Sequence, residues 1–107
     1  MAEDVLTQID EQVKNDRLVI YIKGTPDFPQ CGFSAHVVEI LKSYGYPFEA
    51  VDVLTDPAVR EGIKRYTNWP TIPQIFIGGK FIGGSDILHE MHEQGELAPV
   101  LQAAFGK

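Results

Sequence analysis

A chain of 107 residues is long enough for one compact domain and too short for two, so we expect a single domain over residues 1–107. Its composition, 44% hydrophobic and 22% charged, is typical of a globular protein. No apolar run approaches the ~20 residues of a membrane helix. A net charge of −6 argues against nucleic-acid binding, and a single cysteine excludes an internal disulfide.

The N-terminus lacks the pattern of a secretory signal. Met1-Ala2-Glu3-Asp4 is acidic and has neither the basic nor the apolar part of a signal peptide. We therefore expect a cytoplasmic protein or the mature form of an organellar one.

The first half of the chain predicts helix, strand, helix and strand in turn. Apolar residues at helical spacing predict an amphipathic helix over the first ~15 residues. The apolar run 18–22 predicts a strand that is buried on both faces. A loop at 23–30 then leads into a helix that is expected to stop at Gly45, and a second strand is expected over 48–53. The predicted apolar face of this second helix contains Phe33, Val37, Ile40, Leu41 and Tyr44.

The next segment predicts a helix followed by a β-hairpin. Asp56 is the expected N-cap of a helix that runs to about Tyr66, with proline at its first position. Residues 68–73 break regular structure. Strands over 74–77 and 80–83 are expected to be joined by a tight turn of two glycines.

Two helices are expected to close the chain. Ser85 is the predicted cap of a helix that begins at Asp86, with Ile87, Leu88 and Met91 on its inner face. A last helix is expected over 96–105. The order α-β-α-β-α-β-β-α-α predicts a small mixed sheet with helices on both faces.

Cys31 is the strongest candidate for chemistry because it comes directly before a predicted helix. Unpaired backbone N–H groups and the positive end of the helix dipole favour a thiolate at this place. Lys23, at the end of the preceding strand, adds positive charge. The alternative interpretation is a small buried hydrophobic residue, as many free cysteines are. The position between loop and helix favours the reactive interpretation.

A second thiol is missing from this pattern. In a Cys-X-X-Cys site the second cysteine would stand where this chain has Ser34. A two-thiol mechanism within one chain is therefore impossible, and redox or metal chemistry at Cys31 requires thiols from outside.

Four motifs stand in register over nearly the whole chain, namely Cys31-Gly32-Phe33-Ser34, Lys23-Gly24-Thr25-Pro26, Trp69-Pro70-Thr71-Ile72-Pro73 and Gly83-Gly84-Ser85-Asp86. Together they resemble the monothiol glutaredoxins. The resemblance is to the short, single-domain kind. It implies an α/β thioredoxin fold with a four-stranded mixed sheet and helices on both faces. It also implies binding of glutathione and of a [2Fe–2S] cluster, with Cys31 as the metal ligand.

The resemblance implies that basic residues hold one end of glutathione. Lys23 and Arg60, and less strongly Lys64, are expected to pair with the glycine carboxylate. The alternative for an isolated charge on a helix is a solvated face. Ile72-Pro73 resembles the family's cis-proline turn, which would leave the backbone of Ile72 free to pair with the tripeptide.

Ser85 and Asp86 are expected to hold the other end of glutathione. Both open a helix, so their N–H groups suit the γ-glutamyl carboxylate, and Asp86 suits the ammonium. Many relatives have cysteine where this chain has Ser85, so an internal disulfide to Cys31 is excluded here. The binding role of this position depends mainly on the backbone.

The sequence gives no reason to assign a special function to the histidines or to the single tryptophan. His89 and His92 have i, i+3 spacing without a third metal ligand, and His36 is expected at the surface. Trp69 is equally consistent with the core and with the wall of a ligand site.

Two functions remain open. A [2Fe–2S] cluster takes four ligands, usually thiolates, and two chains that each bring Cys31 and one glutathione supply four. The resemblance implies this carrier, as a homodimer when loaded, with a BolA-type protein and iron–sulfur acceptor apoproteins as further partners. The alternative is a glutathione-dependent oxidoreductase that acts on protein–glutathione mixed disulfides through the Cys31 thiolate. The long loop over residues 24–30 is typical of the carrier class.

Overall fold

The computed structural model describes residues 2–106, which form one sheet with helices on both sides. The strands are β1 (Leu18–Ile22), β2 (Glu49–Asp52), β3 (Gln74–Ile77) and β4 (Lys80–Gly83). Their order in the sheet is β2-β1-β3-β4, with β1 parallel to β2 and the other two pairings antiparallel. The predicted four-stranded mixed sheet is confirmed.

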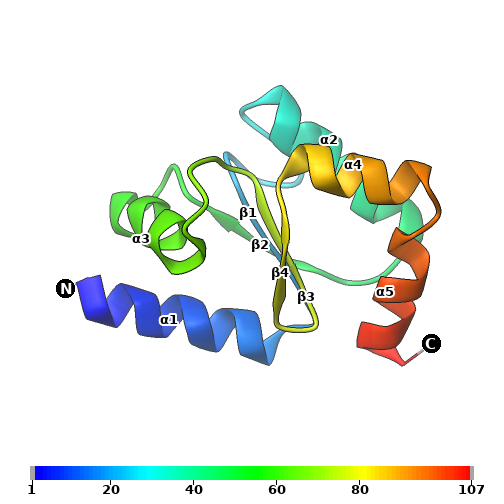
Figure 1. The fold of residues 1–107 in the computed structure, drawn as a ribbon. Coiled ribbons are helices and arrows are strands. Elements are labelled where there is room, and N and C mark those ends of the chain that lie inside the picture. The colour runs from blue at the N-terminus through cyan, green and yellow to red at the C-terminus, as the bar shows by residue number, and fades with distance from the viewer. Residues whose placement is uncertain (1, 107) are drawn as a thin grey trace.

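The helices divide between the two faces of the sheet (Figure 1). They are α1 (Ala2–Asn15), α2 (Gly32–Tyr44), α3 (Pro57–Thr67), α4 (Ser85–Glu93) and α5 (Leu97–Phe105). One face is covered by α1 and α3, and the opposite face by α2, α4 and α5. Among the residues described, no helix is long and apolar enough to span a bilayer.

The central strand β1 separates two hydrophobic cores. Leu18, Ile20 and Ile22 pack with α2, α4 and α5, whereas Val19 and Tyr21 pack with α1 and α3. Alternate side chains of a strand point to opposite faces, so a strand between two helical layers has to be apolar throughout. The expected burial of 18–22 on both faces is confirmed.

Short sequence signals begin or end several elements at the residues where this was expected. The Asp56 carboxylate accepts the N–H groups of Ala58 and Val59 at the start of α3. Gly45 ends α2 in the left-handed conformation, with φ of 79°. Gly78 and Gly79 both have positive φ, 61° and 80°, which a type I′ hairpin turn requires.

The start of α4 differs from the prediction. The helix begins at Ser85, its N-cap is Gly84, and the cap makes no side-chain hydrogen bond. The prediction that Ser85 caps this helix is therefore wrong. A Cβ atom at Gly84 would lie 3.3 Å from the Pro73 carbonyl oxygen and 3.4 Å from Trp69 Nε1, so the small cap lets this turn pack closely on residues 69–73.

Two residues assigned to buried helix faces are exposed. Phe33 is 64% exposed and Ile87 is 38% exposed. Each lies in the first turn of its helix and lines a surface cleft instead of the core. Helical periodicity gives the direction of a side chain, but it does not show where the sheet beneath the helix ends.

Candidate functional site

Cys31 is the N-cap residue of α2. Its backbone is extended, with φ of −149° and ψ of 155°, and its Sγ accepts the N–H of Ser34 at 3.3 Å. The sulfur takes the place of the oxygen that usually caps a helix, at the positive end of the α2 dipole. The residue is half-buried, so the sulfur remains accessible. The predicted position at a helix N-terminus is confirmed.

The surroundings of Cys31 lower the pKa of its thiol. Partial burial acts against this by raising the pKa. The Ser34 hydroxyl, the backbone N–H groups of Ser34 and Phe33, and the Lys23 ammonium stabilise the thiolate, and together they prevail. Ser34 Oγ lies 3.2 Å from Sγ, so its hydroxyl can donate to the sulfur once the thiol has ionised. The thiolate is the form that attacks disulfides and ligates metals.

Ser34 also joins Cys31 to the end of β1. Its side chain is completely buried, and its Oγ accepts the backbone N–H of Lys23 at 3.1 Å. The hydroxyl therefore bridges the reactive sulfur and the residue expected to bind a carboxylate. Serine at the second position of a Cys-X-X-Cys pattern keeps this bridge and removes the second thiol.

The loop between β1 and α2 is closed by backbone hydrogen bonds. Gly24 forms an isolated bridge with Pro29, and its N–H donates to Asp52 Oδ1 at 2.9 Å. With φ of +93°, Gly24 has no room for a side chain, since a Cβ atom would lie 2.5 Å from the Phe28 carbonyl oxygen. Phe28 is 74% exposed at the tip. An apolar ring therefore projects into solvent three residues before the thiol.

A cleft of about 420 Å³ adjoins the thiol. Its walls come from the end of β1, the first turns of α2 and α4, helix α3 and the segment before β3. The lining residues are Lys23, Phe33, Arg60, Lys64, Trp69, Pro70, Thr71, Ile72, Pro73, Gly84, Ser85, Asp86 and Ile87. Five predicted site residues, namely Lys23, Arg60, Ile72, Ser85 and Asp86, thus lie around one cavity.

Cys31 itself is not among the residues that line this cleft. The thiol adjoins the cleft, because the Phe33 N–H and the Lys23 ammonium act on its sulfur and both residues line the cleft. A ligand that fills the cleft can therefore bring one of its groups near Sγ without enclosing the sulfur.

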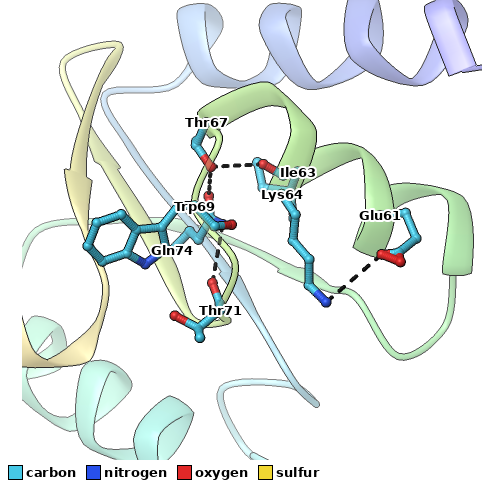
Figure 2. Close-up of polar contacts among 7 residues, drawn as sticks. All are labelled: Glu61, Ile63, Lys64, Thr67, Trp69, Thr71 and Gln74. Carbon is cyan, nitrogen blue, oxygen red and sulfur yellow. Dashed lines mark hydrogen bonds and ion pairs between the residues drawn. The ribbon is translucent and has the colours of Figure 1, made fainter.

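Positive charge gathers on one side of the cleft. Lys23, Arg60 and Lys64 all contribute to its lining. The Lys64 ammonium has one acidic neighbour at longer range, Glu61, 3.9 Å away (Figure 2). Three cations in one cavity suit a ligand that carries a carboxylate.

The opposite wall offers backbone groups. The Ile72–Pro73 peptide bond is cis, as predicted. In α4 the Leu88 N–H donates to the Gly84 carbonyl, so the N–H groups of Ser85, Asp86 and Ile87 precede the first intrahelical donor. These orphan donors lie at the positive end of the helix dipole and suit a second carboxylate.

Sequence reasoning missed several residues of this wall. Phe33 and Ile87 were assigned to the core, and Thr71 was not singled out. Trp69 was left between core and ligand site, and it lines the cleft. The available signal was the motifs themselves, because Phe33, Trp69 and Thr71 lie within them and Ile87 directly follows one.

The histidines pair with other side chains. His36 Nε2 lies 2.9 Å from His89 Nδ1, and His92 Nδ1 lies 2.7 Å from the Tyr44 hydroxyl. Within residues 2–106 no group of three or more His, Cys, Asp or Glu side chains is arranged to hold a metal ion. The i, i+3 spacing of His89 and His92 therefore reflects two separate helix contacts.

The described site combines one stabilised thiolate with a cleft that is lined by three basic residues and by the N-terminus of α4. This chemistry, on a sheet of order β2-β1-β3-β4 with a cis-proline before β3, defines a thiol protein of the thioredoxin fold.

Comparison with known proteins agrees with this class. The glutaredoxin family model matches residues 18–82. A monothiol glutaredoxin of Synechocystis sp. is 48% identical over 98% of this chain and 98% of its own length. The mitochondrial glutaredoxin-related protein 5 of Danio rerio is 50% identical over 88% of this chain, which spans 61% of that protein. The chain belongs to the glutaredoxin family and is of the monothiol type.

Solved structures give the same result for the fold. A buckwheat glutaredoxin–glutathione complex superimposes with a TM-score of 0.86 at 26% identity, covering 96% of this chain and 92% of that chain. The holo form of glutaredoxin C1 from Populus tremula x tremuloides gives a TM-score of 0.88 at 28% identity, covering 99% and 94%. The predicted thioredoxin fold is confirmed.

Proposed function

We propose that this glutaredoxin binds glutathione in the cleft and carries a [2Fe–2S] cluster as cargo between two copies of the chain. Each copy contributes the Cys31 thiolate and one bound glutathione thiolate. The observation that carries the proposal is the pairing of a single stabilised, accessible thiolate with a cleft of matching charge. A second protein thiol is absent, so a four-thiolate cluster requires ligands from outside the chain.

Glutathione fits the two walls in chemical terms. It carries two carboxylates, one ammonium and one thiol. The basic residues Lys23 and Arg60 suit the glycine carboxylate, and the N-terminus of α4 suits the γ-glutamyl carboxylate. Asp86 supplies a counter-charge for the ammonium. The buckwheat relative, which superimposes closely, was solved with glutathione.

The family resemblance suggests the partners of the loaded protein. A second copy completes the four-ligand shell, a BolA-type protein would replace one subunit, and apoproteins would receive the cluster. As for location, a cytoplasmic or mature organellar protein remains our proposal, and the Danio rerio relative is named as mitochondrial.

The test is anaerobic cluster reconstitution with and without glutathione, followed by native mass spectrometry. We expect a dimer with one cluster and two glutathiones, and a monomer when glutathione is withheld. Cys31→Ser is expected to lose both cluster and dimer, whereas Ser34→Ala keeps both because the hydroxyl is not a ligand. A loaded monomer, or a loaded dimer without glutathione, would contradict the proposed ligand count.

A second function, removal of glutathione from mixed disulfides, is favoured by the lowered pKa of Cys31. The thiolate would attack the glutathione sulfur of a protein mixed disulfide, forming a Cys31–glutathione disulfide and releasing the protein thiolate. A second glutathione thiolate would then attack that disulfide, releasing oxidised glutathione and restoring Cys31. Rapid glutathione-dependent turnover of a mixed disulfide, with no stable cluster, would make this the main activity.

A further inference from the structure

Gln74 is a fully buried polar residue at the start of β3, immediately after the cis-proline. Apart from the aromatic Tyr21, the buried polar side chains among the described residues are Ser34, Gln74 and Ser85. Ser34 and Ser85 belong to the thiol site and the cleft. Gln74 is not a lining residue of the cleft, so the site as described gives it no role.

The Gln74 amide uses both of its ends (Figure 2). Its Nε2 donates to the Trp69 carbonyl at 3.1 Å and to the Thr71 carbonyl at 3.2 Å. At the other end, Oε1 lies 2.9 Å from the Thr67 hydroxyl, whose one proton is shared between this oxygen and the Ile63 carbonyl oxygen, 3.0 Å away. Two carbonyls on one side and a hydroxyl on the other leave only one orientation of the amide that satisfies every partner.

The two carbonyls belong to the wall of the cleft. Trp69 and Thr71 lie in the irregular segment 69–73, which contributes all five of its residues to the lining. The segment contains Pro70 and Pro73, which have no N–H, and it lies outside the strand ladder. The Gln74 side chain, and not a strand ladder, supplies the donors to the Trp69 and Thr71 carbonyls of this segment. With these two carbonyls turned toward Gln74, the rest of the segment is left to face the ligand.

The position of this segment also affects the start of α4. Trp69 Nε1 and the Pro73 carbonyl oxygen both lie against Gly84, the N-cap of α4. A shift of Trp69 would therefore change its packing against the residue that starts the anion-binding helix. The Trp69 indole N–H is buried without a partner, so no hydrogen bond of its own fixes the ring.

We infer that Gln74 is a positioning residue for the glutathione cleft: it touches no ligand, but it holds segment 69–73 in the conformation that binds one. This inference rests on the proposed binding of glutathione. A glutamine is suited to the task because it offers two N–H donors and one acceptor without charge. The Thr67 hydroxyl contacts the acceptor oxygen of the Gln74 amide and so helps to fix its orientation.

The experiment compares Gln74→Met with Thr67→Val and with a control. Methionine preserves the length of the side chain and removes both donors, and valine preserves the shape of Thr67 and removes the hydroxyl. Leu101→Ala is the matched control, since Leu101 is fully buried in α5 and lines no part of the cleft. It lowers stability without touching Gln74. Glutathione affinity is measured by calorimetry well below the unfolding temperature of each variant.

We expect Gln74→Met to weaken glutathione binding by about tenfold and Thr67→Val by about two- to threefold. The double variant should resemble Gln74→Met alone, because the two residues act through one amide. Fluorescence offers a readout that needs no ligand: Trp69 is the chain's single tryptophan, and its emission should shift in Gln74→Met. Leu101→Ala should change neither affinity nor emission.

Two results would overturn the inference. A folded Gln74→Met variant with affinity within twofold of wild type would do so, and if that variant does not fold, unchanged affinity in Thr67→Val decides the same way. In both of these cases, if the wild-type protein binds glutathione, the proposed function still stands. A wild-type protein that binds no glutathione would overturn the proposed function and this inference together.

Discussion

Ser34 occupies the position of the second cysteine in a Cys-X-X-Cys pattern and contacts the Cys31 sulfur. Ser34 places both its N–H and its hydroxyl within hydrogen-bond distance of Sγ. It stabilises the thiolate in this way, but it cannot form a disulfide with it. The site therefore keeps a reactive sulfur that must find its partner thiol on another molecule.

The rate of Cys31 alkylation should report this stabilisation. We expect a midpoint below the ordinary cysteine value of ~8.5 when the rate is followed against pH. Ser34→Ala should raise the midpoint, because the hydroxyl donor is lost while the backbone donors remain. Ser43→Ala, an exposed hydroxyl on the same helix, should leave it unchanged. A wild-type midpoint at or above ~8.5 would contradict the assignment.

Arg60 should contribute to glutathione affinity through its carboxylate pair. The side chain is half-buried at the cleft, so we expect Arg60→Ala to weaken binding by about 1–2 kcal/mol, or roughly 5- to 30-fold. Arg65→Ala is the control, since Arg65 is exposed on the same helix and is absent from the cleft lining. Equal affinity of the Arg60 variant and the control in calorimetric titration would reject the role.

At the scale of the elements, α1 and α3 are joined by a polar contact at the edge of their apolar interface. The Tyr66 hydroxyl donates to Asp10 Oδ1 at 2.6 Å, and the Lys14 ammonium lies 3.2 Å from the same oxygen. Burial, the hydrogen bond to Asp10 and the charge of Asp10 raise the pKa of Tyr66 to about 12. The hydrogen bond from Tyr66, followed by the effects of Lys14, lowers the pKa of Asp10.

These shifts predict how stability depends on pH. The contribution of Tyr66 is fully present below its unfolded pKa of ~10 and is lost as pH rises toward 12. The contribution of Asp10 is lost as pH falls through its depressed pKa. Tyr66→Phe should therefore make the free energy of unfolding, measured with urea, depend less on pH at both the acid and the alkaline end. Some loss of stability at alkaline pH should remain in the variant, because burial also raises the pKa of Tyr21. Identical alkaline limbs in wild type and variant would contradict this.

Across the whole molecule, the candidate thiol site lies at one end of two cores that meet at β1. The core under α2, α4 and α5 contains Leu88, Leu97 and Leu101, all fully buried. We expect Leu101→Ala to reduce the free energy of unfolding by about 2–4 kcal/mol, since it leaves a cavity far from the cleft. The Cys31 alkylation profile should not move. A shifted profile would show that the core and the thiol site are coupled.

The distribution of charge is also a property of the whole chain. The net charge is −6, yet Lys23, Arg60 and Lys64 gather at one cleft. The average charge disfavours polyanions such as nucleic acid, and the local cluster still suits a small anion. The average charge follows from composition alone, whereas only the fold brings these three side chains together.

Local sequence determined most of the elements because their signals act over a few residues. Proline and aspartate at the start of α3, glycine at the end of α2 and the glycine pair in the hairpin each impose a backbone conformation that few other residues allow. The position of Cys31 at a helix N-terminus followed from the same kind of signal. The motif resemblance then identified the family and the cis-proline.

Tertiary structure decided what depends on residues distant in the chain. Phe33 and Ile87 fit the helical period of a core face, but both lie in first turns that line the cleft. Gly84 became the cap of α4, in place of Ser85, because its backbone packs against Trp69 and Pro73. The bonds of the Gln74 amide are equally invisible in the sequence, since a buried glutamine is explained only by the carbonyls that the folded chain leaves in need of a donor.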